Sequence, residues 1–281
     1  MAENSSITRT SSFTLHRIEG YINNIFLVEY PEGILAIDPG VASDLPLIER
    51  YCAEVLRRPV SDITLSVVSH MHPDHAGGAV KLRKKHGVPI AAHRLVDSWY
   101  AGFTGLVQHL LDLYMTQIVA RRSRQRLRRI SFKRIIKPDR PLIDSMYLPG
   151  FEDWKVLYIP GHTNHDIVLF NKKEKMLYAA DSIVNVKGSF VLPIPVLFKR
   201  RMINSYRRME SLHASTILLA HGSTIHGKQG QGVFNHLSGL VSGPVPALAR
   251  MPYRLSRFSP GIWKPYIRRK LFGPYYRTRN L

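Results

Sequence analysis

The sequence of 281 residues contains a single cysteine, Cys52. One cysteine cannot form an internal disulfide, and it excludes metal clusters that are built from several thiolates. The lack of disulfides is consistent with a reducing compartment, so we expect a cytoplasmic protein. Cys52 lies among apolar residues at helical spacing, where a thiol acts as a small apolar side chain of the core.

Long apolar runs are also missing. No stretch of about 18 uninterrupted apolar residues, the length that favours a membrane-spanning helix, occurs in the chain. The first ten residues are polar and lack the apolar segment of a secretory signal peptide. We therefore expect neither a spanning helix nor a leader sequence. With 44% hydrophobic residues, the chain can still form a large core.

Acidic residues are scarce in two segments of the chain. Residues 211–281 contain ten Lys or Arg and no Asp or Glu, and residues 121–140 contain ten Lys or Arg and one acid, Asp139. These two segments carry nearly all of the net charge of +20, and the remainder is almost neutral. Two interpretations stay open: binding to an anionic partner, or a solvated basic surface that aids solubility.

The apolar pattern divides the chain into strands and helices that follow one another, which is typical of an α/β fold. The predicted strands are 13–19, 25–29, 34–38, 63–68, 88–92, 154–159, 166–170, 176–180 and 216–220. The predicted helices are 44–58, one that begins near Asp74 and continues over 79–86, and 201–212, with Gly87 closing the second.

Histidines gather directly after the predicted strand 63–68, in the sequence His70-Met71-His72-Pro73-Asp74-His75. His70 and His72 are two residues apart, so at a strand end both side chains leave on the same side. Pro73 makes a turn, and Asp74 and His75 stand where the next helix begins. The alternative to a metal site is a His-rich surface turn.

Three further potential ligands, His162, Asp181 and His221, each follow another predicted strand. Side chains at strand ends from distant parts of a chain meet at one rim of a sheet. Together with the first cluster they supply seven nitrogen and oxygen ligands, enough for two sites for borderline metal ions. Gly77 and Gly78 are expected to let the backbone approach the metal.

These motifs resemble those of the metallo-β-lactamase superfamily. The resemblance rests on the following segments: His70–His75, Gly161-His162-Thr163, Ala180-Asp181, Ala220-His221-Gly222, Asn24–Val28 and Ile37-Asp38-Pro39-Gly40. It covers about 13–225 and implies an α/β fold, a four-layer αβ/βα sandwich, with a helical, basic insertion at about 95–140. We predict a hydrolase domain over 1–230 and a basic, aromatic-containing extension over 231–281.

The resemblance also implies the roles of the ligands. His70, His72 and His162 would hold the first metal ion, whereas Asp74, His75 and His221 would hold the second, with Asp181 as the bridge. It implies two Zn²⁺ ions per chain, with iron or manganese as alternatives. Because the β-lactamases of the common dizinc type use a cysteine at a second-metal position, this ligand set is more similar to glyoxalase-II-like thioesterases, lactonases and phosphodiesterases.

We therefore expect a dinuclear metallohydrolase that cleaves a small-molecule ester, thioester or lactone. Asp74 is the predicted catalytic residue, because it can orient the attacking hydroxide and pass a proton to the leaving group. Two alternatives remain: a phosphodiesterase that acts on nucleic acid or phospholipid, and a non-catalytic, membrane-associated binding protein. Nucleic acid is the less favoured partner, since no additional nucleic-acid-binding domain is recognisable.

Apolar residues between 103 and 119 recur at steps of three and four, which predicts a strongly amphipathic helix about 26 Å long. It runs into the Arg-rich segment 121–129. The apolar stripe can cover the site as a lid or pack against a second copy in a homodimer. Alternatively, the segment 103–137 and the basic C-terminus can contact an anionic membrane surface. In the last case the protein would be peripheral at the inner face of the membrane. His165 and His226 are left without a predicted role.

Overall fold

Two β-sheets pack face to face in the computed structural model, which describes residues 5–122, 128–230, 232–245 and 250–256. The first sheet contains seven strands in sequence order: β1 (Ser5–Arg9), β2 (Thr14–Glu19), β3 (Asn24–Glu29), β4 (Ile34–Ile37), β5 (Ile63–Val68), β6 (Ile90–His93) and β7 (Arg140–Leu142). The pairs from β1 to β4 are antiparallel, whereas β4 to β7 pair in parallel.

The second sheet has six strands in the order β15-β14-β11-β10-β9-β8. Their bounds are β8 (Tyr147–Leu148), β9 (Phe151–Tyr158), β10 (Ile167–Asn171), β11 (Met176–Tyr178), β14 (Thr216–Leu218) and β15 (Ile225–His226). A separate hairpin is formed by β12 (Val184–Val186) and β13 (Ser189–Val191). In the second sheet only the pair β11 and β14 is parallel among the described strands.

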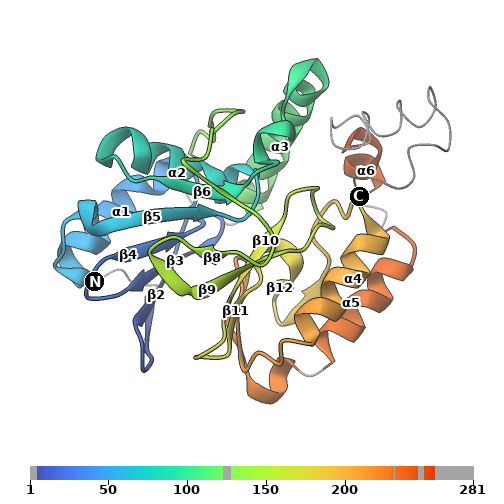
Figure 1. Cartoon of the computed structure of the whole chain (residues 1–281). Coiled ribbons are helices and arrows are strands. Elements are labelled where there is room, and N and C mark those ends of the chain that lie inside the picture. Colours follow the sequence, from blue (N-terminus) through green and yellow to red (C-terminus); the bar gives the residue numbers. More distant parts are fainter. Residues whose placement is uncertain (1–4, 123–127, 231, 246–249, 257–281) are drawn as a thin grey trace.

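Helices cover the outer face of each sheet, as Figure 1 shows. The helices on the first sheet are α1 (Leu45–Tyr51) and α2 (Pro73–His86), and those on the second are α4 (Lys199–Glu210) and α5 (Val233–Ser242). A short helix, α6 (Arg250–Ser256), follows. The helix α3 (Gly102–Arg122) packs on α2 and on the loop residues Tyr21 and Val41 at the end of the sandwich. The resulting order of helix, sheet, sheet and helix confirms the predicted four-layer α/β sandwich.

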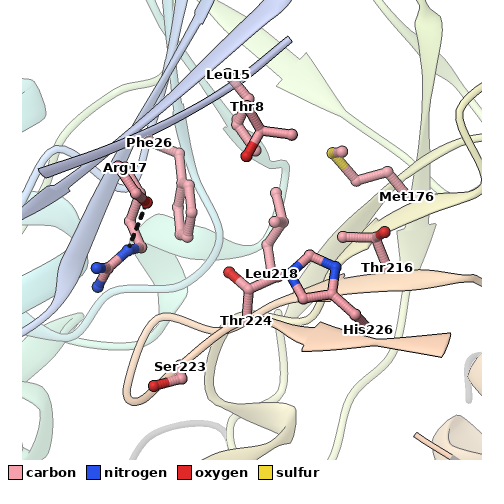
Figure 2. A pocket seen from close by; sticks show the side chains of 11 residues that line it. Thr8, Leu15, Arg17, Phe26, Met176, Thr216, Leu218, Ser223, Thr224 and His226 are labelled. Atoms are coloured by element: carbon pink, nitrogen blue, oxygen red, sulfur yellow. Dashed lines mark hydrogen bonds between the residues drawn. The ribbon is translucent and has the colours of Figure 1, made fainter. Parts of the chain in front are cut away.

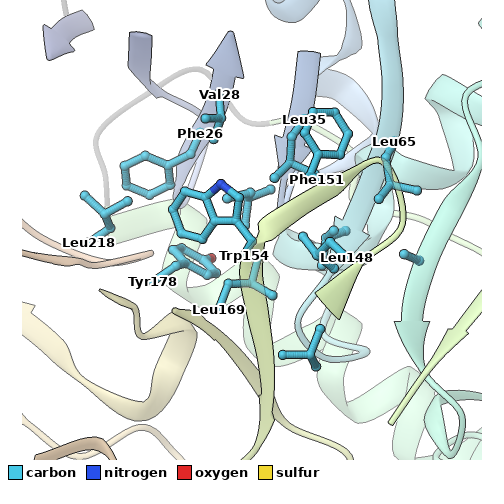
Figure 3. Close-up of a cluster of buried hydrophobic side chains, with 14 of the residues drawn as sticks. Phe26, Val28, Leu35, Leu65, Leu148, Phe151, Trp154, Leu169, Tyr178 and Leu218 are labelled. Carbon is cyan, nitrogen blue, oxygen red and sulfur yellow. The ribbon is translucent and has the colours of Figure 1, made fainter. Parts of the chain in front are cut away.

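The main core lies between the two sheets (Figure 3). Alternate side chains of the first sheet, such as Phe26, Leu35 and Leu65, meet Trp154 and Tyr178 of the second. Further apolar clusters fill the spaces between each sheet and its helices, and Cys52 is buried in the one under α1. Burial of this apolar surface on both faces of both sheets fixes the strand ends relative to one another.

Several predicted elements match the observed ones closely. The strand 63–68 is β5, the helix predicted over 201–212 begins two residues earlier as α4, and Gly87 ends α2 with a φ of 72°. The helix predicted over 44–58 is interrupted, because α1 ends at Tyr51 and passes into a wider turn over Cys52–Leu56. The short strands β1, β7, β8, β12, β13 and β15 had not been predicted.

The predicted C-terminal extension begins with α5, which packs on α4 and places Val233, Phe234 and Leu237 in the core cluster beneath the second sheet. In α6, Tyr253 accepts a hydrogen bond from the backbone N–H of Val196 at 2.8 Å. The predicted basic, aromatic tail from 257 onward lies outside the described residues. The boundary at residue 230 stays a prediction.

Among the described residues, no helix has both the length and the apolar character that crossing a membrane requires.

Candidate metal centre

The seven predicted ligands come together at one end of the sandwich, where loops follow the carboxyl ends of the strands. His70 and His72 lie in the loop between β5 and α2, and Asp74 and His75 stand in the first turn of α2. The other three come from the loops after β9, β11 and β14, and these are His162, Asp181 and His221. They form two groups that could each hold a metal ion.

The first group consists of His70, His72, His162 and Asp181. The Nδ1 atom of His72 lies 3.0 Å from Nε2 of His70 and 2.9 Å from Nε2 of His162. Oδ2 of Asp181 lies 3.8 Å and 3.7 Å from the same two Nε2 atoms. Three imidazole nitrogens and one carboxylate oxygen therefore converge on a common point.

The second group consists of Asp74, His75 and His221. Oδ2 of Asp74 lies 3.3 Å from Nε2 of His221 and 3.7 Å from Nε2 of His75. The other oxygen of Asp181, Oδ1, lies 3.1 Å from Nε2 of His75 and 3.3 Å from Nε2 of His221. Asp181 is thus shared, with one oxygen facing each group.

Hydrogen bonds on the outer side of the rings determine which nitrogen carries the proton. Nδ1 of His162 donates to the carbonyl oxygen of Pro195 at 2.6 Å. Nδ1 of His70 lies 3.0 Å from Oγ of Ser69, whose own hydroxyl donates to Asp38, so His70 is the donor in this pair. Both rings consequently present the lone pair of Nε2 to the centre, which is the form that binds a metal ion.

Asp38 holds both groups in place from beneath. Its buried carboxylate accepts hydrogen bonds from the backbone N–H of Ser69 at 2.7 Å, from Nδ1 of His75 at 2.7 Å and from the hydroxyl of Tyr178. Asp38 lies directly after β4 with a φ of 44°, a conformation that is uncommon for residues other than glycine. The sequence identified Asp38 only as part of a motif, and its contacts give it an orienting role.

The two groups differ in charge. Burial, together with the neighbouring imidazoles, holds the pKa of His70 well below its ordinary value and lowers that of His72 to about 3. Burial would also lower the pKa of His221, but the carboxylates of Asp181 and Asp74 outweigh it and raise the value to about 10. The pKa of His75 is raised in the same way. Thus the imidazoles of His70 and His72 stay neutral, whereas the second group attracts positive charge.

The residues fit a metal ion. Nε2 of His75 and Oδ1 of Asp181 are both buried, and neither has a hydrogen-bond partner within the described part of the chain. A buried nitrogen and a buried carboxylate oxygen without partners are costly unless a cation satisfies them. The imidazole and carboxylate donors, with no thiolate among them, suit zinc, iron or manganese.

Asp112 of α3 is a further residue of the centre, which sequence reasoning missed. Its Oδ2 lies 3.7 Å from Nε2 of His72, on the side of the ring opposite the group. Gln108 donates to Oδ1 at 2.7 Å, and the hydroxyl of Tyr100 donates to Oδ2 at 2.8 Å. Burial raises the pKa of Asp112 to about 6. The signal in the sequence was the four-residue spacing of Gln108, Asp112 and Thr116 along one helix face.

His165, which had no predicted role, supports the loop that carries the first two ligands. Its Nε2 accepts a hydrogen bond at 2.9 Å from the backbone N–H of Met71, the residue between His70 and His72. Its Nδ1 lies 2.9 Å from Oδ1 of Asn164 and is the donor in that pair, because Nε2 is already an acceptor. His165 is fully buried, and burial holds its pKa well below its ordinary value, so it stays neutral.

The expectation that Gly77 and Gly78 make room for a metal was wrong. A Cβ on Gly78 would lie 2.0 Å from the carbonyl oxygen of Pro39, and one on Gly77 would lie 2.8 Å from the backbone nitrogen of Ala42. The backbone N–H of Gly78 donates to the carbonyl of Gly40 at 2.7 Å. The two glycines instead let α2 pack closely on the loop after β4, which carries Asp38.

His226 lies away from these ligands. It lines a cavity of about 300 Å³ between the edges of the two sheets, together with Thr8, Phe26 and Met176 (Figure 2). None of the seven ligand residues is among the residues that line this cavity. We therefore treat it as separate from the metal centre.

Solved structures with the same fold include metallo-β-lactamases. One from Pontibacter korlensis has a TM-score of 0.59 at 16% identity and covers 86% of this chain and 100% of its own. The metallo-β-lactamase FIM-1 from Pseudomonas aeruginosa, in its mono-zinc form, has a TM-score of 0.58 at 16% identity over 84% and 94%. A peroxy diiron species of the chemotaxis sensor ODP has a TM-score of 0.57 at 16% identity over 84% and 94%.

These likenesses concern the fold alone, because the identities are low. The search of curated proteins found no match. The family model of the metallo-beta-lactamase superfamily, in contrast, matches residues 18–221, which include every ligand of the two groups. Since this match extends over most of the chain and the motifs within it meet in one centre, the chain belongs to the metallo-β-lactamase superfamily.

Proposed function

We propose that the protein is a dinuclear metal-dependent hydrolase that cleaves an ester, thioester or lactone. The observation that carries this proposal is the position of Asp181, which turns one oxygen toward each ligand group. A carboxylate in that position is suited to bridge two ions. Membership of a superfamily whose members are generally hydrolases supports the same reaction class.

The first ion would be held by His70, His72 and His162, the second by Asp74, His75 and His221, and both by Asp181. Ions bound there would lower the pKa of a water molecule toward about 7 and polarise the carbonyl of the substrate. With this arrangement, no side chain of the protein is needed as a covalent nucleophile. The task of the chain is to hold the ligands, exclude bulk water and handle protons.

Asp74 is the residue that we assign to proton handling. It stands in the first turn of α2, where the partial positive charge of a helix N-terminus favours the carboxylate form. Burial would raise its pKa, but His75 and His221 outweigh this effect and lower it. Asp74 is therefore ionised at neutral pH, and a free carboxylate oxygen can take a proton and later give it to the leaving group.

For the metal we propose zinc, with iron or manganese as alternatives. Imidazole and carboxylate ligands accept all three. The structures of similar fold include a mono-zinc form and a peroxy diiron species, so the fold accommodates both metals. Elemental analysis of protein purified without chelators tests the number and the identity of the ions, and a value near zero or one after metal supplementation contradicts the dinuclear proposal.

A phosphodiester is the second candidate substrate. The observation that favours it is the set of exposed basic residues next to α3, among them Arg129 and Lys133. The segment that carries these residues runs along α3, whose exposed apolar side chains favour a phospholipid over nucleic acid. Cleavage of either bond would use the same two ligand groups, so only a measurement of turnover distinguishes the two substrate classes.

The test is a panel of substrates given to metal-loaded protein: a chromogenic ester, a thioester, a lactone and bis(p-nitrophenyl) phosphate. We expect turnover of a carboxylic ester, thioester or lactone above that of the phosphodiester, and its loss in Asp74→Ala. Glu54→Ala, an exposed carboxylate on the helix side of the first sheet, is the control and should keep full turnover. Preferred turnover of the phosphodiester would replace the first proposal, and no turnover by fully loaded protein would favour a non-catalytic binding protein.

A further inference from the structure

The helix α3 has its polar face turned inward and its apolar face turned outward. Gln108, His109, Asp112 and Thr116 are buried. Phe103, Leu110 and Tyr114 are 79%, 56% and 59% exposed, and Leu106 and Val107 are also exposed. At about 3.6 residues per turn these five apolar residues lie on one side of the helix. We call them the outer face of α3. An ordinary surface helix has the opposite orientation.

The inward contacts fix this orientation. Asp112 lies next to His72 and is held by Gln108 and Tyr100. Nε2 of His109 lies 3.1 Å from the carbonyl oxygen of Phe132, in the segment that returns along the helix. Rotating α3 to bury the apolar residues would remove these polar contacts and take Asp112 away from the centre. The apolar exposure is therefore a fixed property of the fold.

Exposed cations lie on α3 itself and on the segment that returns along it. Arg121 continues the same side of the helix, seven residues after Tyr114, and is exposed. The returning segment 128–137 runs back along α3, since Arg134 donates at 3.2 Å to the carbonyl oxygen of Gly102 at the start of the helix. This segment carries the exposed cations Arg129 and Lys133. The only acid within α3 is Asp112, which is buried.

We propose that the outer face of α3 docks on an anionic lipid surface, with its apolar side chains at the level of the headgroups and Arg121, Arg129 and Lys133 against the lipid phosphates. Apolar side chains beside Lys and Arg are the pattern of helices that lie in a membrane interface. In Figure 1, one end of α3 projects beyond the sandwich, so the helix can reach a flat surface.

A second copy of the chain fits the outer face less well. In a twofold dimer each surface meets its own copy, so the two basic segments would come close together and repel each other. Nucleic acid would contact the cations and stack on Phe103 and Tyr114, but it would leave the aliphatic side chains between these two rings in water. An anionic lipid surface is complementary to both the charge and the apolar side chains.

Docking in this way places the metal centre behind a single helix. The inner face of α3 contributes Asp112 to the centre, and a helix is roughly 10 Å wide, so His72, which lies 3.7 Å beyond Asp112, is separated from the lipid by little more than the helix itself. The docked protein would meet amphiphilic esters or phosphoesters that enter from the bilayer. This statement about substrates rests on the proposed function, whereas the docking itself does not.

Co-sedimentation of the full chain with vesicles tests the proposal. The vesicles consist of phosphatidylcholine alone or mixed with phosphatidylglycerol, and the salt is about 50 mM or about 500 mM, which shortens the screening length severalfold. We expect binding to the mixed vesicles at low salt, and binding at least about tenfold weaker at high salt or to phosphatidylcholine alone. Binding that does not depend on lipid charge or on salt overturns the proposal.

Matched variants separate the two contributions. The outer-face variant is Phe103→Ser/Leu110→Asn/Tyr114→Ser, and its control is Ile143→Ser/Val186→Ser, two exposed apolar residues elsewhere. The charge variant is Arg129→Gln/Lys133→Gln, and its control is Lys172→Gln/Lys173→Gln in the turn before β11. We expect at least about tenfold weaker vesicle binding in both α3 variants and none of this loss in either control.

Two further measurements keep the outcome interpretable. Thermal unfolding should be unchanged in all four variants, because every substituted side chain is exposed. Turnover of a water-soluble ester should also be unchanged, so that a failure of vesicle binding is distinguished from a failure of the proposed hydrolysis. Light scattering without lipid that shows a dimer lost only in the outer-face variant would assign the outer face to a second copy and overturn lipid docking.

Discussion

The two ligand groups use different means to hold their side chains. In the first group, His70 and His162 are oriented by neutral partners, a hydroxyl and a carbonyl, and burial holds the pKa of His70 well below its ordinary value. In the second group, the carboxylates of Asp74 and Asp181 draw positive charge onto His75 and His221. Hydrogen bonds to neutral groups thus orient His70 and His162, whereas the ligands of the second group lie among carboxylates that favour positive charge. We expect the second group to depend more strongly on its ion.

Substitution of Asp181, the ligand that the two groups share, should weaken ion binding in both groups. Asp181→Ala removes the oxygen that faces each of them, so both should lose affinity for their ions, and turnover should fall by more than about 10²-fold. Asp181→Asn keeps one oxygen ligand, so its metal content and turnover should lie between those of the unchanged protein and those of Asp181→Ala. Elemental analysis after dialysis, together with turnover, measures both effects. Full metal content and full turnover in Asp181→Ala would show that the carboxylate is not shared.

Substitution of Asp74 should remove the ion of the second group and leave that of the first in place. Asp74→Ala removes a ligand from the second group only, so the first group should keep its ion while turnover falls by at least about 10²-fold. The reason is that the second ion and the proton acceptor are lost together. Metal content near one ion per chain is the expected readout, with Glu54→Ala as the control that stays at two. Equal loss of both ions would contradict the separation.

The contact from α3 should affect the first group alone. Asp112→Asn keeps the shape of the side chain but removes the charge next to Nε2 of His72, and loss of such an outer partner weakens metal binding roughly tenfold. Competition with a chelator measures the affinity. Thr116→Val, one turn further along the same buried face, is the control and should leave it unchanged. An unaltered affinity in Asp112→Asn would remove Asp112 from the centre.

The smallest effect is expected at His165, which supports the loop of the first group without facing the ions. His165→Phe leaves the buried N–H of Met71 without an acceptor and should lower the free energy of unfolding by about 1–3 kcal/mol. His165→Gln offers a carbonyl oxygen instead and should recover part of the loss. Urea unfolding of the metal-free protein measures the difference, and identical values for the two variants would argue against this role.

Much of the fold could be predicted, because local patterns indicate it directly. The apolar run 63–68 followed by paired histidines marked β5 and the start of α2 within a residue or two. The ligands could be identified because each one follows a strand, and strand ends from distant parts of the chain meet at one rim. Short strands such as β8 and β15 were missed, since two residues carry no periodicity.

Other features depend on contacts between distant elements. The periodicity of α3 predicted the helix and its apolar stripe, but the contact between Asp112 and His72 decides which face points inward. Similarly, the approach of α2 to the loop after β4 decides the role of Gly78. Only the folded chain brings these residues together, so no local pattern in the sequence could reveal them.

One buried carboxylate, Asp38, contacts the ligand shell of both groups. Through Ser69 it orients His70, and through Nδ1 of His75 it orients a ligand of the other group, so one buried carboxylate positions both. Asp38 is already fixed by these contacts and by the hydroxyl of Tyr178 without any ion, so the two groups share one preformed anchor. Loss of this single carboxylate should therefore weaken ion binding in both groups at once.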